Sequence, residues 1–439
     1  MHHDVHISVD EQLVLSPKFK RNLYIALAIG IILFVIGVAM AAMGGGGHDT
    51  HSIHGAEATQ EITEAVAETA HHGPTWMTRM WADLWHNSVF FSGIALLGVF
   101  FMCVQYVAWA GWSSILKRIP ESFGSFLPIG GALLLVIFLV ANHDIFHWTH
   151  EGLTDPKSPE YDKIIAGKSG YLNVPFFLTR MVVFFGLWYF MWTLMRKQSL
   201  LEDQHGGDSY YHKSGYISAI FLFIFGISVP MAGWDWVMSI DTHWFSTMFW
   251  VYNFASWWVS SLSAITLICI YLKENGYLKG MNDNHFHDLG KFMFAFSIFW
   301  AYIFLGQWLL IFYANIPEET VYFLDRTQAY DKKYTFLFFF LLFINFVFPF
   351  LWFMTRDSKR KTLLLKIGGI GLIFGHWLDF YVMIMPGVTK GTSEIGFMEI
   401  GLLIAFVSLF IIIITNTLTK AKLIPQNHPM LEESLHHSI

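Results

Sequence analysis

The chain alternates between long apolar windows and short polar breaks. Windows of about twenty apolar residues recur along almost its whole length, separated by charged or Gly/Pro-rich segments. A helix needs about twenty such residues to cross the ~30 Å hydrocarbon layer of a membrane, and a backbone in lipid must satisfy its own hydrogen bonds. We therefore predict an all-α integral membrane protein. The ten expected spans are at about 23–43, 87–110, 126–147, 174–195, 214–235, 245–272, 289–313, 334–354, 363–385 and 396–416.

Composition agrees with this assignment and narrows the possible functions. Hydrophobic residues make up 54% of the 439 residues and charged residues 14%, against about a quarter charged in a typical soluble domain. The net charge of −6 and the lack of a dense basic patch exclude nucleic acid as a partner. There is no CxxCH motif for covalent haem and no four-cysteine iron–sulfur pattern. We therefore expect no redox centre in this chain.

The distribution of basic residues predicts the orientation. Most lysines and arginines lie on the side of the N-terminus once the spans are laid out, which places both termini in the cytoplasm. The small residues "AMA" at 39–41 have the form of a signal-peptide cleavage site. The long apolar stretch before them and the long polar leader favour a retained anchor instead.

A weak internal repeat divides the spans into two groups. The fifth span ends in "GWDWVMSI" and the ninth in "GHWLDFYVMIMPG", which pairs Asp235 with Asp379. The segments "WADLWHNSVFFSG" and "WVMSIDTHWFSTMF" similarly pair His86 with His243. Spans 2–5 and 6–9 would then be two four-helix bundles in a parallel repeat, with spans 1 and 10 peripheral. The alternative is a chance likeness between aromatic-rich membrane ends.

The predicted organisation follows from the spans and the repeat. It comprises a cytoplasmic tail (1–22), a first peripheral span (23–43), a His-rich outer loop (44–86), a first four-helix bundle (87–235), a second four-helix bundle (236–385), an outer loop with the last peripheral span (386–416) and a cytoplasmic tail (417–439). The loop histidines suit a metal ion, but a solvated loop explains them more simply.

Ionisable residues near the spans are the candidates for function, because a charge in hydrocarbon costs at least ~2.5 kcal/mol and usually marks a pathway. All are expected in the outer third of a span or in the adjoining loop. Carboxylates and imidazoles within reach of one another or of water can pass protons, which suggests a half-channel from the outer surface. The proton-pathway candidates are His143, Asp144, His147, Asp235, Asp241, His243, His376, Asp379 and Glu399, with Arg180 as a charge partner.

The stretch "HDIFH" has several interpretations. His143 and His147 are four residues apart, so on one helix they share a face and could bind a metal ion. An interfacial hydrogen-bonded cluster and a proton relay are the other interpretations, and no metal site is assigned. His376 is the only histidine well inside a span away from this stretch, so the facing pair that haem b needs is not expected.

Two stretches carry a resemblance to a known family. These are "WDWVMSIDTHWFSTMFWVYNFASWW" (234–258) and "GQWLLIFYANIPEET" (306–320). Together with ten spans in two units, they resemble the polysulfide-reductase-like (NrfD) membrane family over essentially the whole chain. Within that family, the chain is most similar to the second large membrane subunit of bacterial alternative complex III, a quinol:cytochrome c oxidoreductase.

The resemblance implies a cofactor-free subunit in the bacterial inner membrane that scaffolds redox subunits and provides an outer-side proton pathway coupled to quinol oxidation. Haem c and iron–sulfur clusters would lie in its partners. The implied partners are a paralogous NrfD-like membrane subunit, multihaem and monohaem cytochrome c subunits, an iron–sulfur subunit, lipid and a terminal oxidase. No motif here specifies a quinone head group. The alternatives are a stand-alone secondary transporter, a quinone-binding anchor of another NrfD-type oxidoreductase, and a membrane cytochrome b.

Overall fold

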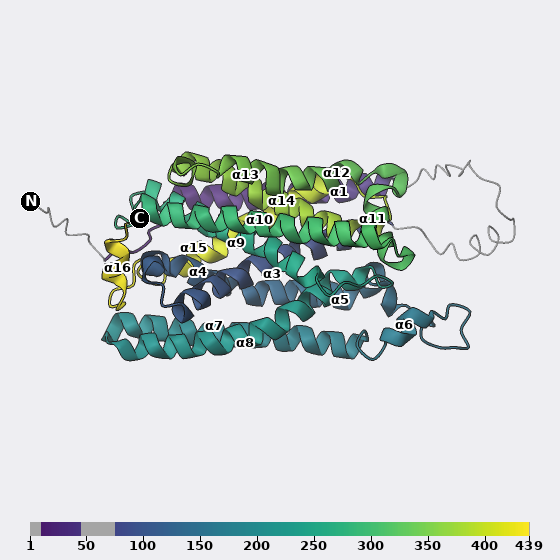
Figure 1. Ribbon diagram of the computed structural model, residues 1–439, viewed down its shortest axis with the longest axis horizontal. Coiled ribbons are helices and arrows are strands. Elements are labelled where there is room, and N and C mark those ends of the chain that lie inside the picture. Colours follow the sequence, from purple (N-terminus) through teal and green to yellow (C-terminus); the bar gives the residue numbers. More distant parts are fainter. Residues whose placement is uncertain (1–9, 45–74, 439) are drawn as a thin grey trace, which may run out of the picture.

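The computed structural model describes residues 10–44 and 75–438. Their regular structure is helical apart from one isolated bridge between Gln12 and Lys422. Ten of the described helical segments are long and apolar enough to cross a membrane, which confirms the prediction of an all-α, multi-pass membrane protein. Residues 10–16 and 419–438 lie at one end of the bundle, here called the tail end (Figure 1). The helices α6 (Lys163–Lys168) and α11 (Pro317–Thr327) lie at the opposite, loop end.

The spans are formed by α1 (Pro17–Gly44), α3 (Trp76–Val107), α4 (Arg118–Phe123) continuing through η2 (Gly124–Phe126) into α5 (Leu127–Ile145), α7 (Val174–His205), α8 (Asp208–Trp236) with η4 (Met238–Ile240), α9 (Phe249–Glu274), α10 (Asp283–Ala314), α12 (Thr335–Leu342) with the π-helical η6 (Phe343–Val347) and α13 (Phe348–Trp352), α14 (Thr362–Thr389) and α15 (Phe397–Leu418). The shorter connecting helices are η1 (Gly111–Leu116), η3 (His147–Thr149), η5 (Tyr330–Lys332), η7 (Asp357–Lys359) and α16 (Leu431–Leu435).

Helix contacts divide the central spans into two groups. In the first group α3, α5, α7 and α8 form a closed ring of neighbours, and in the second α9, α10, α12–α13 and α14 do the same. The groups meet where α3 packs against α9 and α14 and where α8 packs against α9. The apolar windows of α3 and α9 are accordingly 89% and 83% buried inside the protein, against 11% for α1. Side chains on α3, α9 and α14 therefore have protein neighbours where other spans face lipid.

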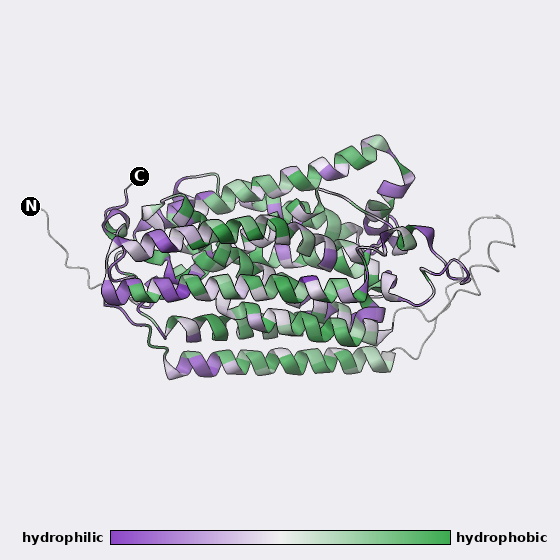
Figure 2. Ribbon diagram, turned by 90° about the horizontal axis from the view of Figure 1, so that it is seen from below, coloured by the Kyte–Doolittle hydropathy of each residue, from purple (hydrophilic) through white to green (hydrophobic). Residues whose placement is uncertain are grey.

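The outer surface of the bundle suits a lipid environment. Large apolar side chains such as Phe223, Tyr302 and Leu351 are exposed, and Figure 2 shows hydrophobic residues along the middle of the bundle with hydrophilic residues gathered at both ends. A soluble protein rarely exposes so continuous an apolar surface. The band of exposed apolar residues is the surface that the hydrocarbon would cover.

The peripheral helices α1 and α15 pack against each other through glycines. A Cβ atom at Gly30 would lie 2.6 Å from the backbone nitrogen of Ala405, and one at Gly401 would lie 2.8 Å from the carbonyl oxygen of Gly30. Such distances leave no room for a side chain, so these glycines allow the two backbones to approach closely, as small residues do between membrane helices.

One predicted segment is wrong. The His-rich outer loop was expected over 44–86 and the second span from 87, yet α3 begins at Trp76, so 76–86 form its first turns. The hydroxyl of Thr75 caps the helix by accepting a hydrogen bond from the N–H of Thr78 at 3.3 Å. The polar residues within 76–86 suggested a loop. Composition alone does not distinguish a loop from a helix whose polar face is buried against neighbouring helices. Residues 45–74 of this loop lie outside the described residues.

Candidate functional site

Asp379 lies inside the second helix group, where it is fully buried. Its carboxylate accepts hydrogen bonds from the hydroxyl groups of Tyr252 and Ser256 on α9. It also accepts one from Nε1 of Trp300 on α10, at 2.8 Å. Three uncharged donors from two other helices thus converge on one carboxyl group within the membrane-spanning part of the protein.

His376 adds an imidazole to this Asp379 cluster. Its Nδ1 lies 3.8 Å from Oδ2 of Asp379, and both of its ring nitrogens are buried without a hydrogen-bond partner among the described residues. Buried polar atoms normally find a partner, often an ordered water molecule. Carboxyl, hydroxyl and imidazole groups are the side chains that exchange protons, so the cluster is chemically equipped to hold and transfer a proton.

Polar groups connect the Asp379 cluster towards the loop end. A small cavity beside Tyr252 is also lined by Gln307, Tyr322 and Arg326. Nη2 of Arg326 donates to Asp241 at 2.8 Å, and its guanidinium lies 3.4 Å from the centre of the Tyr322 ring. Asp241 lies in the connection between α8 and α9 and is partly exposed. Polar atoms therefore extend from the surface at Asp241 to the neighbourhood of Asp379.

The charge of Arg326 is supported by its surroundings. Burial by itself would lower the pKa of the guanidinium, but the neighbouring Tyr322 and Asp241 outweigh this effect and the pKa is raised. Burial also raises the pKa of Asp325 on the same helix, and the negative charge of Asp241 raises it further. Arg326 is therefore a permanent positive charge at this position.

A second buried cluster joins α3 to α14. Oδ1 of Asp83 accepts a hydrogen bond from Asn87 at 3.0 Å and lies 3.5 Å from Nδ1 of His86. Nε2 of His86 donates to the carbonyl oxygen of Trp377 at 3.0 Å, and Nε1 of Trp377 donates to Asn87 at 3.0 Å. Asp83 escaped the sequence analysis because 44–86 was assigned to a loop. The helical spacing of Arg79, Asp83 and His86 was the available signal.

Glu399 has a structural explanation. Its carboxylate accepts hydrogen bonds from Nε and Nη2 of Arg79 at 2.7 and 2.9 Å and from the N–H of Gly396 at 2.8 Å. It therefore caps the N-terminus of α15 and compensates the charge of Arg79. This pair ties the first turn of α3 to α15 at the loop end.

Arg180 and Asp235 form a two-pronged ion pair between α7 and α8. Nε of Arg180 lies 2.6 Å from Oδ2 of Asp235 and Nη2 lies 3.1 Å from Oδ1. The rings of Tyr171 and Phe176 cover the guanidinium, with centres 3.9 and 4.2 Å from its carbon. Asp379, the predicted repeat equivalent of Asp235, is surrounded by hydroxyl and indole donors instead. The charge of Asp235 is thus already compensated within the fold.

The histidines of the loop end lie at the surface. Helix α5 ends at Ile145 and His147 belongs to η3, so the premise that His143 and His147 share one helix face is wrong. Oδ1 of Asp144 accepts a hydrogen bond from Thr78 at 3.1 Å. Burial and the neighbouring His150 lower the pKa of His147. No group of three or more metal-ligating side chains occurs within 10–44 and 75–438.

Two further expectations are wrong. His243 is exposed in the connection before α9 and donates to Asp162 at 2.6 Å, whereas His86 is fully buried inside α3. The two histidines therefore do not correspond. His376 lies midway along α14 and not in an outer third, and residue 376 is also near the middle of the predicted span 363–385.

A buried ionic network at the tail end was not anticipated. Glu121 on α4 accepts hydrogen bonds from Arg118 at 3.0 Å, Arg196 at 2.8 Å and Ser199 at 2.9 Å. Lys117 donates to Glu202 at 2.8 Å. The charge distribution placed Lys117, Arg118 and Arg196 among the basic residues of the cytoplasmic side. Helix α7 extends to His205, and its Arg196 and Ser199 reach Glu121 on α4. The i, i+3 spacing of Arg118 and Glu121 was a signal for this network.

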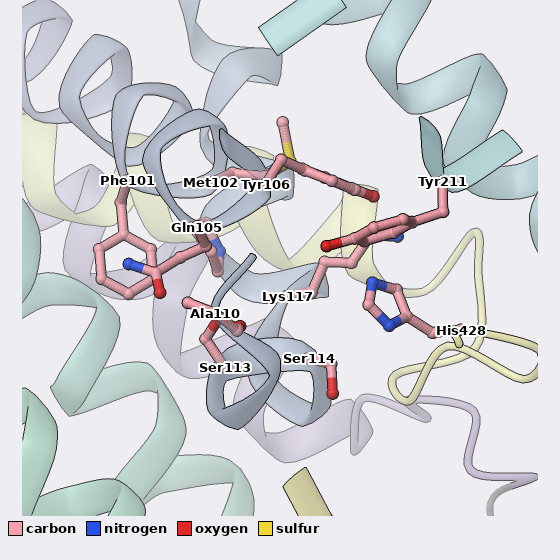
Figure 3. A pocket seen from close by; sticks show the side chains of 11 residues that line it. Phe101, Met102, Gln105, Tyr106, Ala110, Ser113, Ser114, Lys117, Tyr211 and His428 are labelled. Carbon is pink, nitrogen blue, oxygen red and sulfur yellow. The ribbon is translucent and has the colours of Figure 1, made fainter. Parts of the chain in front are cut away.

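A pocket beside this network is lined in part by His428, which belongs to the C-terminal segment 419–438 (Figure 3). Lys117, Tyr211 and His428 gather at one side of it, and Gln105 lines it as well. Nδ1 of His428 accepts a hydrogen bond from the N–H of Met430 at 3.2 Å. Burial, together with the charges of Lys117 and Arg118, lowers the pKa of His428 to about 2. The histidine is therefore neutral when the segment is docked.

No protein-family model and no curated protein sequence matches this chain.

Proposed function

We propose that this chain is an integral membrane subunit of a quinol:cytochrome c oxidoreductase of the alternative complex III type. In this proposal it scaffolds the redox subunits and provides a proton pathway from the outer side, coupled to quinol oxidation. The observation that carries the proposal is the buried carboxyl group of Asp379, held by Tyr252, Ser256 and Trp300 beside His376. The resemblance of the two quoted stretches supplies the oxidoreductase context.

The pathway begins at the loop end in this proposal. Asp241 beside Arg326 forms the entrance, the cavity next to Tyr252 holds water, and Asp379 with His376 is the buried acceptor. Each transfer needs donor and acceptor within hydrogen-bond reach, directly or through one water molecule. Arg326 serves as a fixed positive charge beside Asp241 at this entrance.

The proposal also fixes location and partners. The membrane is the bacterial inner membrane with both termini in the cytoplasm, so the loop end faces outwards. Haem c and iron–sulfur clusters belong to the partner subunits, which are cytochrome c subunits, an iron–sulfur subunit and a paralogous membrane subunit. Asp235 is assigned a structural role, because Arg180 compensates its charge.

The proton pathway is tested by Asp379→Asn in the assembled complex in liposomes. Proton release per electron is measured as quinol is oxidised. We expect the proton-coupled turnover to fall about ten-fold or more, since Asn cannot carry a proton. Asp162→Asn is the matched control, because Asp162 is a loop-end carboxylate bonded to the exposed His243. If Asp379→Asn leaves both stoichiometry and rate unchanged, the pathway is refuted.

The subunit assignment needs a separate measurement. An affinity tag on this chain should co-purify c-type cytochromes, detected by their haem spectrum, and an iron–sulfur subunit. Purification of the chain alone in a form that transports a solute would contradict the assignment and favour a secondary transporter. A haem spectrum from the isolated chain would instead identify a cytochrome b.

A further inference from the structure

A cavity of ligand size opens at the loop end of the first helix group. It lies between the segment around α6 and the connection from α8 to α9, and its volume is about 350 Å³. Small-molecule sites commonly measure about 300–1,000 Å³. Tyr171, Trp244 and Phe245 contribute aromatic rings to its wall. Aromatic residues concentrate where a membrane meets water, so this cavity has the composition of a site at the membrane boundary.

The cavity presents hydrogen-bond donors that the protein satisfies only in part or not at all. Nε1 of Trp234 is buried and has no hydrogen-bond partner among the described residues. Lys168 also lines the cavity, and its ammonium group donates to the carbonyl oxygen of Thr242 at 2.5 Å. An ammonium carries three N–H donors. No carboxylate of the described part of the chain lies within ion-pair distance of Lys168, so its charge lacks a direct counter-ion.

The neighbouring charges leave Lys168 as the cation available to a ligand. Arg180, which packs against the ring of Tyr171, is already paired with the carboxylate of Asp235 through two hydrogen bonds. Asp162 is held by His243 and by the backbone N–H groups at the start of α6. A ligand that fits this cavity should therefore bring a negative charge and acceptor oxygens to Lys168 and Trp234, and an apolar part to the aromatic wall.

We propose that this cavity binds the head group of an anionic phospholipid, with the phosphate between Lys168 and the indole N–H of Trp234. Charge complementarity and the position of the cavity at the end of a membrane-spanning helix select a lipid over a soluble anion. The glycerol backbone and first acyl carbons then contact Trp244 and Phe245. The inference is independent of the proposed function, since it uses neither the Asp379 cluster nor any partner subunit.

The test compares lipid retention by the full-length protein in detergent. Native mass spectrometry counts bound phosphatidylglycerol and phosphatidylcholine after both are supplied in equal amounts. The native chain should retain phosphatidylglycerol preferentially, and Lys168→Gln should weaken that binding about five-fold, as expected for one basic residue at an anionic lipid surface. Trp234→Phe, which removes only the donor, should weaken it as well.

Lys163→Gln is the matched control, because Lys163 is exposed on the same short helix but does not line the cavity. It should retain the native preference. Equal retention of the two lipids by the native chain, or equal losses in Lys163→Gln and Lys168→Gln, would overturn the proposal. Displacement of the lipid by a soluble quinone analogue at this cavity would also overturn it. Thermal unfolding without added lipid checks that the variants are folded. If Lys168→Gln does not fold, Trp234→Phe still tests the proposal.

Discussion

Arg180 and Asp235 face each other inside the first helix group, with two N–H to oxygen contacts of 2.6 and 3.1 Å and both side chains almost fully buried. The two residues are far apart in the sequence. The charge of either one alone would be unfavourable inside a membrane. Their pairing holds α7 against α8 near the loop end. The aromatic cover from Tyr171 and Phe176 keeps water away from the pair.

Breaking this pair from one side should be strongly destabilising. Asp235→Leu leaves a buried guanidinium without a counter-ion, and we expect a loss of about 3–5 kcal/mol in the free energy of unfolding. The double variant Arg180→Met with Asp235→Leu should recover most of that loss, because no charge is left uncompensated. Equilibrium unfolding in mixed micelles measures the free energy of unfolding of the single and double variants. A double variant that is less stable than Asp235→Leu would contradict the pairing of these two residues.

Asp379 should tolerate an amide better than an apolar side chain. Asp379→Leu leaves the hydroxyl groups of Tyr252 and Ser256 without an acceptor, at about 1–3 kcal/mol for each buried group, and leaves Nε1 of Trp300 with only the Ser256 hydroxyl at 3.0 Å. Asp379→Asn keeps one acceptor oxygen and should lose less. Unfolding in micelles compares the two, with Asp144→Asn, a partly exposed carboxyl group bonded to Thr78, as control. Equal stability of the Leu and Asn variants would show that these hydrogen bonds contribute little.

Docking of the C-terminal segment should depend on pH through His428. Its pKa is about 2 in the folded protein, against about 6.5 in an unfolded chain. Below about pH 6 the unfolded chain therefore binds a proton that the folded protein does not, so folded stability falls as pH falls. The loss amounts to roughly 1.4 kcal/mol per pH unit.

The variant His428→Asn isolates this effect. Asn retains an acceptor for the N–H of Met430 but does not titrate, and all other histidines are common to both proteins. Unfolding is measured from about pH 7 to about pH 5. The stability difference between the native chain and His428→Asn should change steadily in favour of the variant as pH falls, and a constant difference would rule out His428 as the titrating group.

The packing of α1 against α15 should depend on glycine at position 401. A Cβ atom there would lie 2.8 Å from the carbonyl oxygen of Gly30 and even closer to the backbone of Phe34. Gly401→Leu should therefore displace α1 and cost about 1–3 kcal/mol. Gly186→Leu is the control, because nothing lies within 4 Å of a Cβ at Gly186. Limited proteolysis of the N-terminal segment and unfolding measurements distinguish the variants, and equal behaviour would refute close packing at Gly401.

Hydrophobic patterning alone was sufficient for the fold class and for the ten spans. The reason is physical: hydrocarbon accepts only backbone whose hydrogen bonds are satisfied locally, so every span must be a long apolar helix whatever its neighbours are. The same cost of burying charge marked Asp379, His376, Asp235 and Arg180 as unusual. These conclusions need no knowledge of which helices touch.

Tertiary structure decided what those residues contact. Asp235 meets Arg180 while Asp379 meets Tyr252 and Trp300, although the sequence repeat pairs the two aspartates. Asp83 and Glu121 were overlooked because a charged residue near a span end has the same sequence signature whether it faces water or a neighbouring helix. The sequence by itself determined which segments enter the membrane, since that depends on the solvation of each segment alone. Only helix packing determined which charges are paired, capped or left to water, because these interactions join residues that are far apart along the chain.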